Sequence, residues 1–173
     1  DGGVRLAAPL SPALHLGAQK ILAISTRYDR SAAEAMIPEV TGYPPPAQVV
    51  GVLLNSVFLD LLDQDALRLE RLNDLIDQVP KEGRNGLRPV RLLVLRPSVD
   101  LGRLANEFEP NLPKAFRFLT RGLGTRQTTS PDLLSLMLFQ PDYVARLIEL
   151  GEADARAQTE EIVEFIRAGA YED

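Results

Sequence analysis

The stretch DGGVRLAAPLSPALHLGAQKILAIST, residues 1–26, decides the fold, because it places a turn, a short helix and a buried strand in immediate succession. Asp1-Gly2-Gly3 puts a carboxylate at a tight turn, where glycine permits a positive φ and a close approach of backbone to a ligand. Asp1 is therefore the candidate functional side chain, with Gly2 and Gly3 as motif glycines. An ordinary turn aspartate is the alternative interpretation.

The residues after this turn predict a helix and then a strand. Ser11-Pro12 is typical of an N-cap followed by a first-turn proline, and the helix that it opens ends near Gly17. Residues 20–26 (KILAIST) and 90–96 (VRLLVLR) are short apolar runs typical of buried strands. The connection between them is long enough for a crossover helix, so we expect a parallel pair in an α/β fold with few strands.

A long amphipathic helix is expected in that crossover, over residues 50–79. Its apolar side chains recur every three or four positions, at Leu54, Phe58, Leu62, Ala66, Leu69, Leu72, Ile76 and Val79. Pro80 and the glycines that follow end it. The rest of the chain is predominantly helical, with helices expected over residues 101–108, 112–123, 131–138, 141–150 and 153–168. Gly151 is expected to separate the last two.

Composition excludes several classes of protein. The chain has 173 residues, enough for one domain or part of one. It contains no Cys, which excludes disulfides and thiolate chemistry, and His15 is its single histidine, which excludes a His-rich metal site. No apolar run approaches the roughly 18 to 20 residues of a membrane helix. We expect no metal and no nucleotide cofactor.

The charges are unevenly distributed. The net charge of −5 argues against nucleic acid as a partner. Residues 84–126 carry nine basic and three acidic side chains, whereas residues 140–173 carry nine carboxylates and three arginines. Two interpretations remain open: a basic face that contacts a membrane surface transiently, or a basic segment that is solvated or docked against the acidic tail.

The opening stretch also resembles the patatin-like phospholipases. Their catalytic Asp lies in an Asp-Gly-Gly or Asp-Gly-Ala motif, followed by a proline-containing helix and an apolar strand. The matching residues are Asp1-Gly2-Gly3, Pro9-Leu10-Ser11-Pro12-Ala13, Leu16-Gly17-Ala18 and the strand that begins at Lys20. The strong resemblance covers residues 1–27. Residues 52–56 (VLLNS) and 92–97 are similar to bacterial members, with less specificity.

The resemblance implies a three-layer α/β fold and a serine lipid acyl hydrolase with a Ser–Asp dyad. In this family a Ser in a Gly-x-Ser-x-Gly turn attacks the acyl ester, the Asp accepts its proton, and a glycine-rich loop binds the oxyanion. This chain contains no Gly-x-Ser-x-Gly, and in the family both missing elements precede the Asp motif. We therefore expect the C-terminal segment of a longer hydrolase, inactive alone, in which Asp1 is the general base.

The expected partners are a lipid or ester substrate and the upstream segment of the same polypeptide, in the cytoplasm or at the periphery of a membrane. Residues 1–27 would belong to the catalytic domain, and residues 28–173 would form a helix-rich remainder packed on it. Two alternatives stay open. The chain from about Tyr43 onward is a helical protein-interaction module, or the whole is a pseudoenzyme without the nucleophile.

Other candidate residues have ordinary structural explanations. His15 lies between two leucines of the short helix, where packing or exposure is more usual than catalysis. Ser25 and Ser98 follow strands but lack the flanking glycines of a nucleophile elbow, so we expect turn or cap residues. Asp100 is expected to be a helix N-cap.

Two further groups of side chains have a functional interpretation beside a structural one. Glu107 and Glu109 are too isolated to predict a paired-carboxylate site. A set of apolar side chains would line an acyl channel or form plain core: Phe108, Phe116, Phe118, Leu138 and Phe139.

Overall fold

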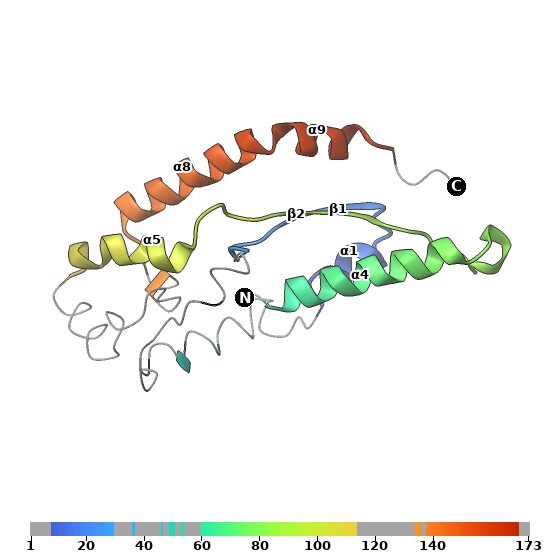
Figure 1. Cartoon of the computed structure of the whole chain (residues 1–173), viewed down its shortest axis with the longest axis horizontal. Coiled ribbons are helices and arrows are strands. Elements are labelled where there is room, and N and C mark those ends of the chain that lie inside the picture. The colour runs from blue at the N-terminus through green and yellow to red at the C-terminus, as the bar shows by residue number, and fades with distance from the viewer. Residues whose placement is uncertain are drawn as a thin grey trace. The chain divides into compact units, whose positions relative to one another are not determined.

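The computed structural model describes residues 8–29, 60–113 and 138–169, with the isolated positions 36, 46, 49, 50, 53, 134 and 135. The chain divides into two compact units. Unit 1 comprises residues 1–25, 57–95 and 158–173, and unit 2 comprises residues 26–56 and 96–157. Helices predominate over one small sheet in the described residues, so the fold has the general α/β character that the sequence predicts (Figure 1).

Unit 1 contains the sheet, which has two strands within the described residues. β1 (Lys20–Ile24) and β2 (Arg91–Leu95) run parallel, with Lys20 opposite Arg91 and Ile24 opposite Leu95. The ladder continues at both ends: the Ser25 N–H donates to the Leu95 carbonyl at 2.9 Å, and the Arg91 N–H donates to the Gln19 carbonyl at 3.0 Å. The predicted parallel pair is confirmed, with each strand slightly shorter than expected.

Helix α1 (Ser11–His15) precedes β1, and its first turn differs from the prediction. Pro12 occupies the first turn as expected, but the N-cap is Leu10 and no side chain caps the helix. The prediction of Ser11 as N-cap is therefore wrong. The reason is packing, because Leu10 is only 4% exposed and its burial sets where the helix begins.

The end of α1 agrees with the sequence. Gly17 has φ +83°, a conformation that glycine adopts without a Cβ penalty. Its N–H donates to the Leu14 carbonyl at 2.9 Å, and the Ala18 N–H donates to the Ala13 carbonyl at 3.0 Å. These two bonds are those of a Schellman motif, which satisfies carbonyl groups left over at the helix end. The motif turns the chain directly into β1.

Helix α4 (Asp60–Gln78) covers one face of the sheet. Ala66 and Leu69 are buried in a core with Leu10, Ile21 and Val90. The expected apolar stripe is correct at most described positions, but Leu72 and Val79 are 44% and 39% exposed. The prediction for these two side chains is wrong. The buried row passes through Asn73, and the expected residues 50–59 lie mostly outside the described residues.

Helix α9 (Thr159–Arg167) lies on the other side of the two strands from α4 (Figure 1). The Lys20 ammonium joins it to β1 by donating to three carbonyls, those of Phe165 at 3.2 Å, Ile166 at 2.8 Å and Ala168 at 2.7 Å. A cation is favourable there because the C-terminal end of a helix carries partial negative charge.

Unit 2 contains α5 (Leu101–Phe108), the short 3₁₀ helix η3 (Glu109–Asn111) and α8 (Pro141–Ala157). Its core is formed by Leu104, Ala105, Leu134, Leu138 and Tyr143. The bounds predicted for α5 are confirmed. The helices expected over residues 112–123 and 131–138 lie mostly outside the described residues.

The prediction that Gly151 ends a helix is wrong, because α8 continues through it to Ala157. Glycine costs a helix about 1 kcal/mol relative to alanine. Leu147 and Leu150 pack on the unit 2 core before this position, and Asp154 accepts a hydrogen bond after it. Tertiary contacts on both sides of Gly151 therefore outweigh its low helix propensity.

Candidate functional site

Ligands bind at the carboxyl ends of the strands in open α/β sheets, so the sequence predicts the candidate site at the ends of β1 and β2. Asp1, Gly2 and Gly3 lie outside the described residues, so their positions stay predictions. The described part of the site is the scaffold that follows the motif. Ser25 stands directly after β1, is buried, and its N–H is bonded to Leu95.

The chain shortly after the Asp motif is anchored to α4. The Leu10 N–H donates to Asp65 Oδ2 at 2.9 Å, and the Leu10 side chain is buried in the unit 1 core. One carboxylate thus binds a backbone donor at the start of α1, where helix N–H groups have no intrahelical partner. The segment nine residues after Asp1 therefore has a fixed place on the helix layer.

A second contact holds the turn between α1 and β1. The Arg88 guanidinium donates from Nη2 to the Gly17 carbonyl at 3.0 Å. A Cβ added to Gly17 would meet this nitrogen at 3.5 Å, an ordinary van der Waals distance. The positive φ, rather than crowding, is what requires glycine here.

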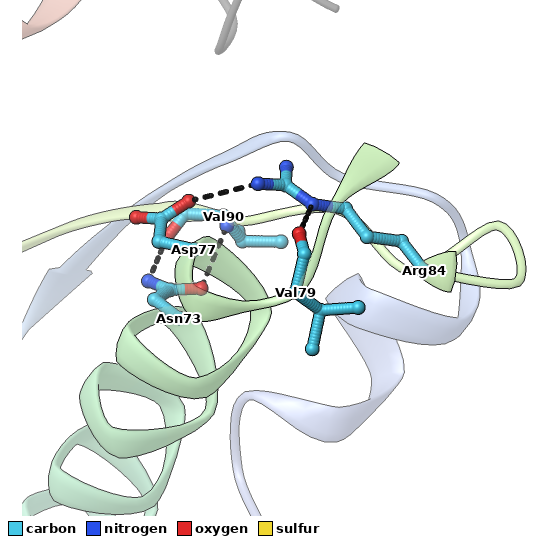
Figure 2. A network of polar contacts seen from close by, with 5 residues as sticks. All are labelled: Asn73, Asp77, Val79, Arg84 and Val90. Atoms are coloured by element: carbon cyan, nitrogen blue, oxygen red, sulfur yellow. Dashed lines mark hydrogen bonds and ion pairs between the residues drawn. The ribbon is translucent and has the colours of Figure 1, made fainter. Parts of the chain in front are cut away.

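Asn73 holds α4 against the start of β2 (Figure 2). Its Nδ2 donates to the Val90 carbonyl at 2.8 Å, and the Val90 N–H donates to its Oδ1 at 3.0 Å. A side-chain amide with this geometry offers one donor and one acceptor, as a neighbouring strand would. The Asn73 amide therefore satisfies the N–H and the carbonyl of Val90 as the backbone of a neighbouring strand would.

Arg84 closes the other end of the same network (Figure 2). Its Nε donates to the Val79 carbonyl at 2.9 Å, and its Nη2 lies 3.7 Å from Asp77 Oδ1. Arg84 directly follows the 3₁₀ helix η2 (Lys81–Gly83), so it ties the turn to the end of α4. Arg84 and Arg88 of the basic stretch thus contact the end of α4 and the Gly17 carbonyl, which tests neither docking against the acidic tail nor contact with a membrane.

Three candidate residues of the sequence, His15, Ser98 and Asp100, make ordinary structural hydrogen bonds. His15 is exposed, and its Nδ1 lies 2.8 Å from the Ser11 carbonyl of the same helix. Because a carbonyl only accepts, Nδ1 carries the hydrogen in this contact. The Ser98 side chain is exposed, while its N–H donates to Asp154 Oδ2 at 2.9 Å. Asp100 is an N-cap as predicted, accepting at Oδ1 from the N–H groups of Gly102 at 2.9 Å and of Arg103 at 3.1 Å.

The aromatic side chains do not gather at one place in the described residues. Phe108 packs edge-on against Tyr143 with ring centroids 5.3 Å apart, and Leu138 is buried beside them. Phe139 is 83% exposed, and Phe116 and Phe118 lie outside the described residues. Leu138 is therefore a core residue of unit 2, and Phe108 is a partly buried side chain packed against that core.

The two acidic candidates differ in burial, since Glu109 is buried and Glu107 is exposed. Burial also raises the pKa of the Tyr143 hydroxyl. Within the described part of the chain, no three His, Cys, Asp or Glu side chains are grouped as metal ligands would be.

Comparison with protein-family models, with curated proteins and with solved structures finds no match for this chain. None of its described helices combines the length and apolar content needed to cross a bilayer.

Sequence reasoning missed three residues that hold segments of unit 1 together and one that binds Ser98 within unit 2: Lys20, Asp65 and Asn73 in unit 1, and Asp154 in unit 2. A usable signal existed for Asn73. It lies four residues after Leu69 and three before Ile76, on the buried row of α4. A polar side chain on an apolar stripe needs a hydrogen-bond partner, and backbone at the end of a strand is a common one.

Proposed function

We propose that this chain is the C-terminal segment of a patatin-like serine lipid acyl hydrolase, and that Asp1 is the general base of its Ser–Asp dyad. The observation that carries the proposal is the order of Asp-Gly-Gly turn, proline-containing helix and parallel strand. The helix, its Schellman turn and the strand are present as α1, Gly17 and β1. Parallel strands place their carboxyl ends together, where catalytic groups gather in α/β proteins.

In this proposal each residue has a limited role. Asp1 accepts the proton of a serine supplied by the upstream segment, and Gly2 and Gly3 shape the turn that presents it. The contacts of Leu10 with Asp65 and of Gly17 with Arg88 position the segment that follows. The sheet with helices on both sides supports the three-layer architecture of the family as a part of the proposal.

The test is hydrolysis of short-chain nitrophenyl esters by the intact parent protein. Asp1→Asn should lower kcat by about 10²- to 10⁴-fold, the usual contribution of a general base. Asp29→Asn is the matched control, since Asp29 is an exposed carboxylate beyond β1. His15→Ala should keep turnover, because the dyad needs no histidine. Near-normal turnover in folded Asp1→Asn would refute the role of Asp1.

The interaction-module alternative predicts that residues 40–173 fold alone and bind a partner protein. Unit 1 takes β1 from residues 1–25, so deleting them removes half of the described sheet. This discontinuity favours the hydrolase proposal over an independent module. The pseudoenzyme alternative predicts a folded parent that lacks both Gly-x-Ser-x-Gly and esterase activity.

A further inference from the structure

We propose that the strand leading into Asp1 pairs in parallel with the outer edge of β1, the edge that faces away from β2. The proposal rests on the proposed function, in which polypeptide precedes Asp1. It specifies the sheet order as preceding strand, β1, β2. The catalytic turn would then lie beside the end of β1, next to Ser25.

Within the described residues, no strand pairs with the backbone of β1 on this edge. In a parallel ladder, alternate residues direct their N–H and C=O groups to opposite sides. The bonds of Gln19 and Ser25 to β2 assign the odd-numbered residues to that side. Lys20, Leu22 and Ile24 therefore direct their backbone groups to the outer edge. The described sheet has no strand there, and such an edge is a template for strand addition.

The side chains of β1 are typical of an interior strand. Strands inside a parallel sheet are apolar on both faces. Ile21 faces α4, while Leu22 and Ile24 lie on the opposite face, 40% and 77% exposed. Edge strands are commonly protected by charged side chains. The one charged residue of β1, Lys20, is bonded instead to the end of α9.

The outer edge of β2 is less suited to a new strand. By the same alternation, Val90, Leu92 and Val94 direct their backbone groups away from β1. Asn73 already binds both the N–H and the carbonyl of Val90. A strand added there would have to displace this amide or begin after it.

Connection handedness selects the same edge. Crossovers between parallel strands are right-handed in nearly all proteins. Helices α1 and α4 pack on one face of the sheet, since Leu10 and Ala66 share the core with Ile21. Two right-handed crossovers with helices on one face move the chain in one direction across the sheet. Because the second moves from β1 to β2, the first must arrive at β1 from the side opposite β2.

The test is residue-resolved amide hydrogen exchange on the natural polypeptide that contains residues 1–173. We expect the amides of Leu22 and Ile24 to exchange at least about 10-fold more slowly than those of Leu92 and Val94. The amides of Ile21, Ala23 and Ser25, which face β2, are the internal control and should be protected in any case. In the 173-residue chain by itself, the Leu22 and Ile24 amides should lose their protection while this control keeps it.

Slow exchange at Leu92 and Val94 with fast exchange at Leu22 and Ile24 would overturn the proposal by placing the strand beside β2. Fast exchange at all four would overturn it by leaving the sheet two-stranded, as would a natural polypeptide that begins at Asp1. Ester hydrolysis by the same preparation separates the two proposals. Protection without turnover leaves the sheet order standing and refutes the hydrolase, whereas turnover without protection does the reverse.

Discussion

Replacing Asn73 by alanine tests whether a single side-chain amide holds α4 to β2. The substitution removes two hydrogen bonds, one with the N–H and one with the carbonyl of Val90, and Val90 is only 6% exposed. A lost hydrogen bond costs about 0.5 to 1.5 kcal/mol, and a backbone group left buried without a partner costs about 1 to 3 kcal/mol. Alanine returns roughly 0.5 kcal/mol through its higher helix propensity. We therefore expect a net loss of about 2 to 3 kcal/mol in the free energy of unfolding.

The assay is urea unfolding followed by far-ultraviolet circular dichroism, with amide exchange at Val90 as a local readout. Gln64→Ala is the control, because Gln64 is an exposed amide on the same helix, and its gain in helix propensity is smaller than that of Asn73→Ala. It should change stability by less than about 0.5 kcal/mol. Asn73→Asp keeps an acceptor for the Val90 N–H and loses the donor, so it should also destabilise. A loss in Asn73→Ala no larger than that of the control would refute the reasoning, since water would then replace the amide without cost.

Three further predictions test other parts of the protein. Gly17→Ala should lower the free energy of unfolding by about 1 to 2 kcal/mol, because Gly17 has a φ of +83° that alanine adopts only with strain. Gly151→Ala should raise it by about 0.5 to 1 kcal/mol, because no atom lies within 4 Å of the added Cβ and alanine is the better helix former. Thermal unfolding of both variants measures this contrast. Asp100→Ala should cost about 1 kcal/mol in urea unfolding through loss of the α5 N-cap, and Asp100→Asn should restore most of it. Burial raises the pKa of Tyr143, so the unfolded state ionises first and stability falls as pH rises above about 10. In Tyr143→Phe the free energy of unfolding should therefore fall less between pH 8 and pH 11 than in the unsubstituted protein. At pH 8 the variant should be less stable by under about 1 kcal/mol, because the lost hydrogen bond of the hydroxyl to the Leu101 carbonyl is long, at 3.5 Å.

The elements that the sequence predicted well are those whose signals are local. The strands follow from two short apolar runs, the end of α1 from Gly17, and the start of α5 from Asp100, a residue type with a strong preference for N-caps. Each signal lies within a few residues of the feature that it determines. The parallel pairing followed in turn from the length of the connection between the strands.

The wrong predictions concern contacts between distant segments. Leu72 and Asn73 are adjacent on α4, and Asn73 is the half-buried one because its amide binds the backbone of Val90, which lies in a different segment of the chain. Gly151 remains helical because contacts with α5 and its surroundings hold the helix on both sides. Ser11 does not cap α1 because the burial of Leu10 moves the start of the helix. No local pattern encodes these choices.

The candidate site was predictable as a motif and less so as a scaffold. Asp1 remains a prediction from its turn and from the elements that follow it. Lys20 was assigned to a strand by its neighbours, but nothing in its surroundings indicated that its ammonium would meet carbonyls nearly 150 positions later. Such a contact is visible only when both segments are placed in space.

Because unit 1 is made of three separated segments, its parts leave the ribosome at different times. Its three segments are separated by the two segments of unit 2, and the last of them, residues 158–173, leaves the ribosome after all the others. Until then the Lys20 ammonium lacks the carbonyls at the end of α9, and the β1–β2 pair lacks its helix on that side. Non-local contacts of this kind slow folding and prolong the exposure of apolar surface. The newly made chain should therefore depend on chaperones most strongly in the interval between the emergence of β2 and that of α9.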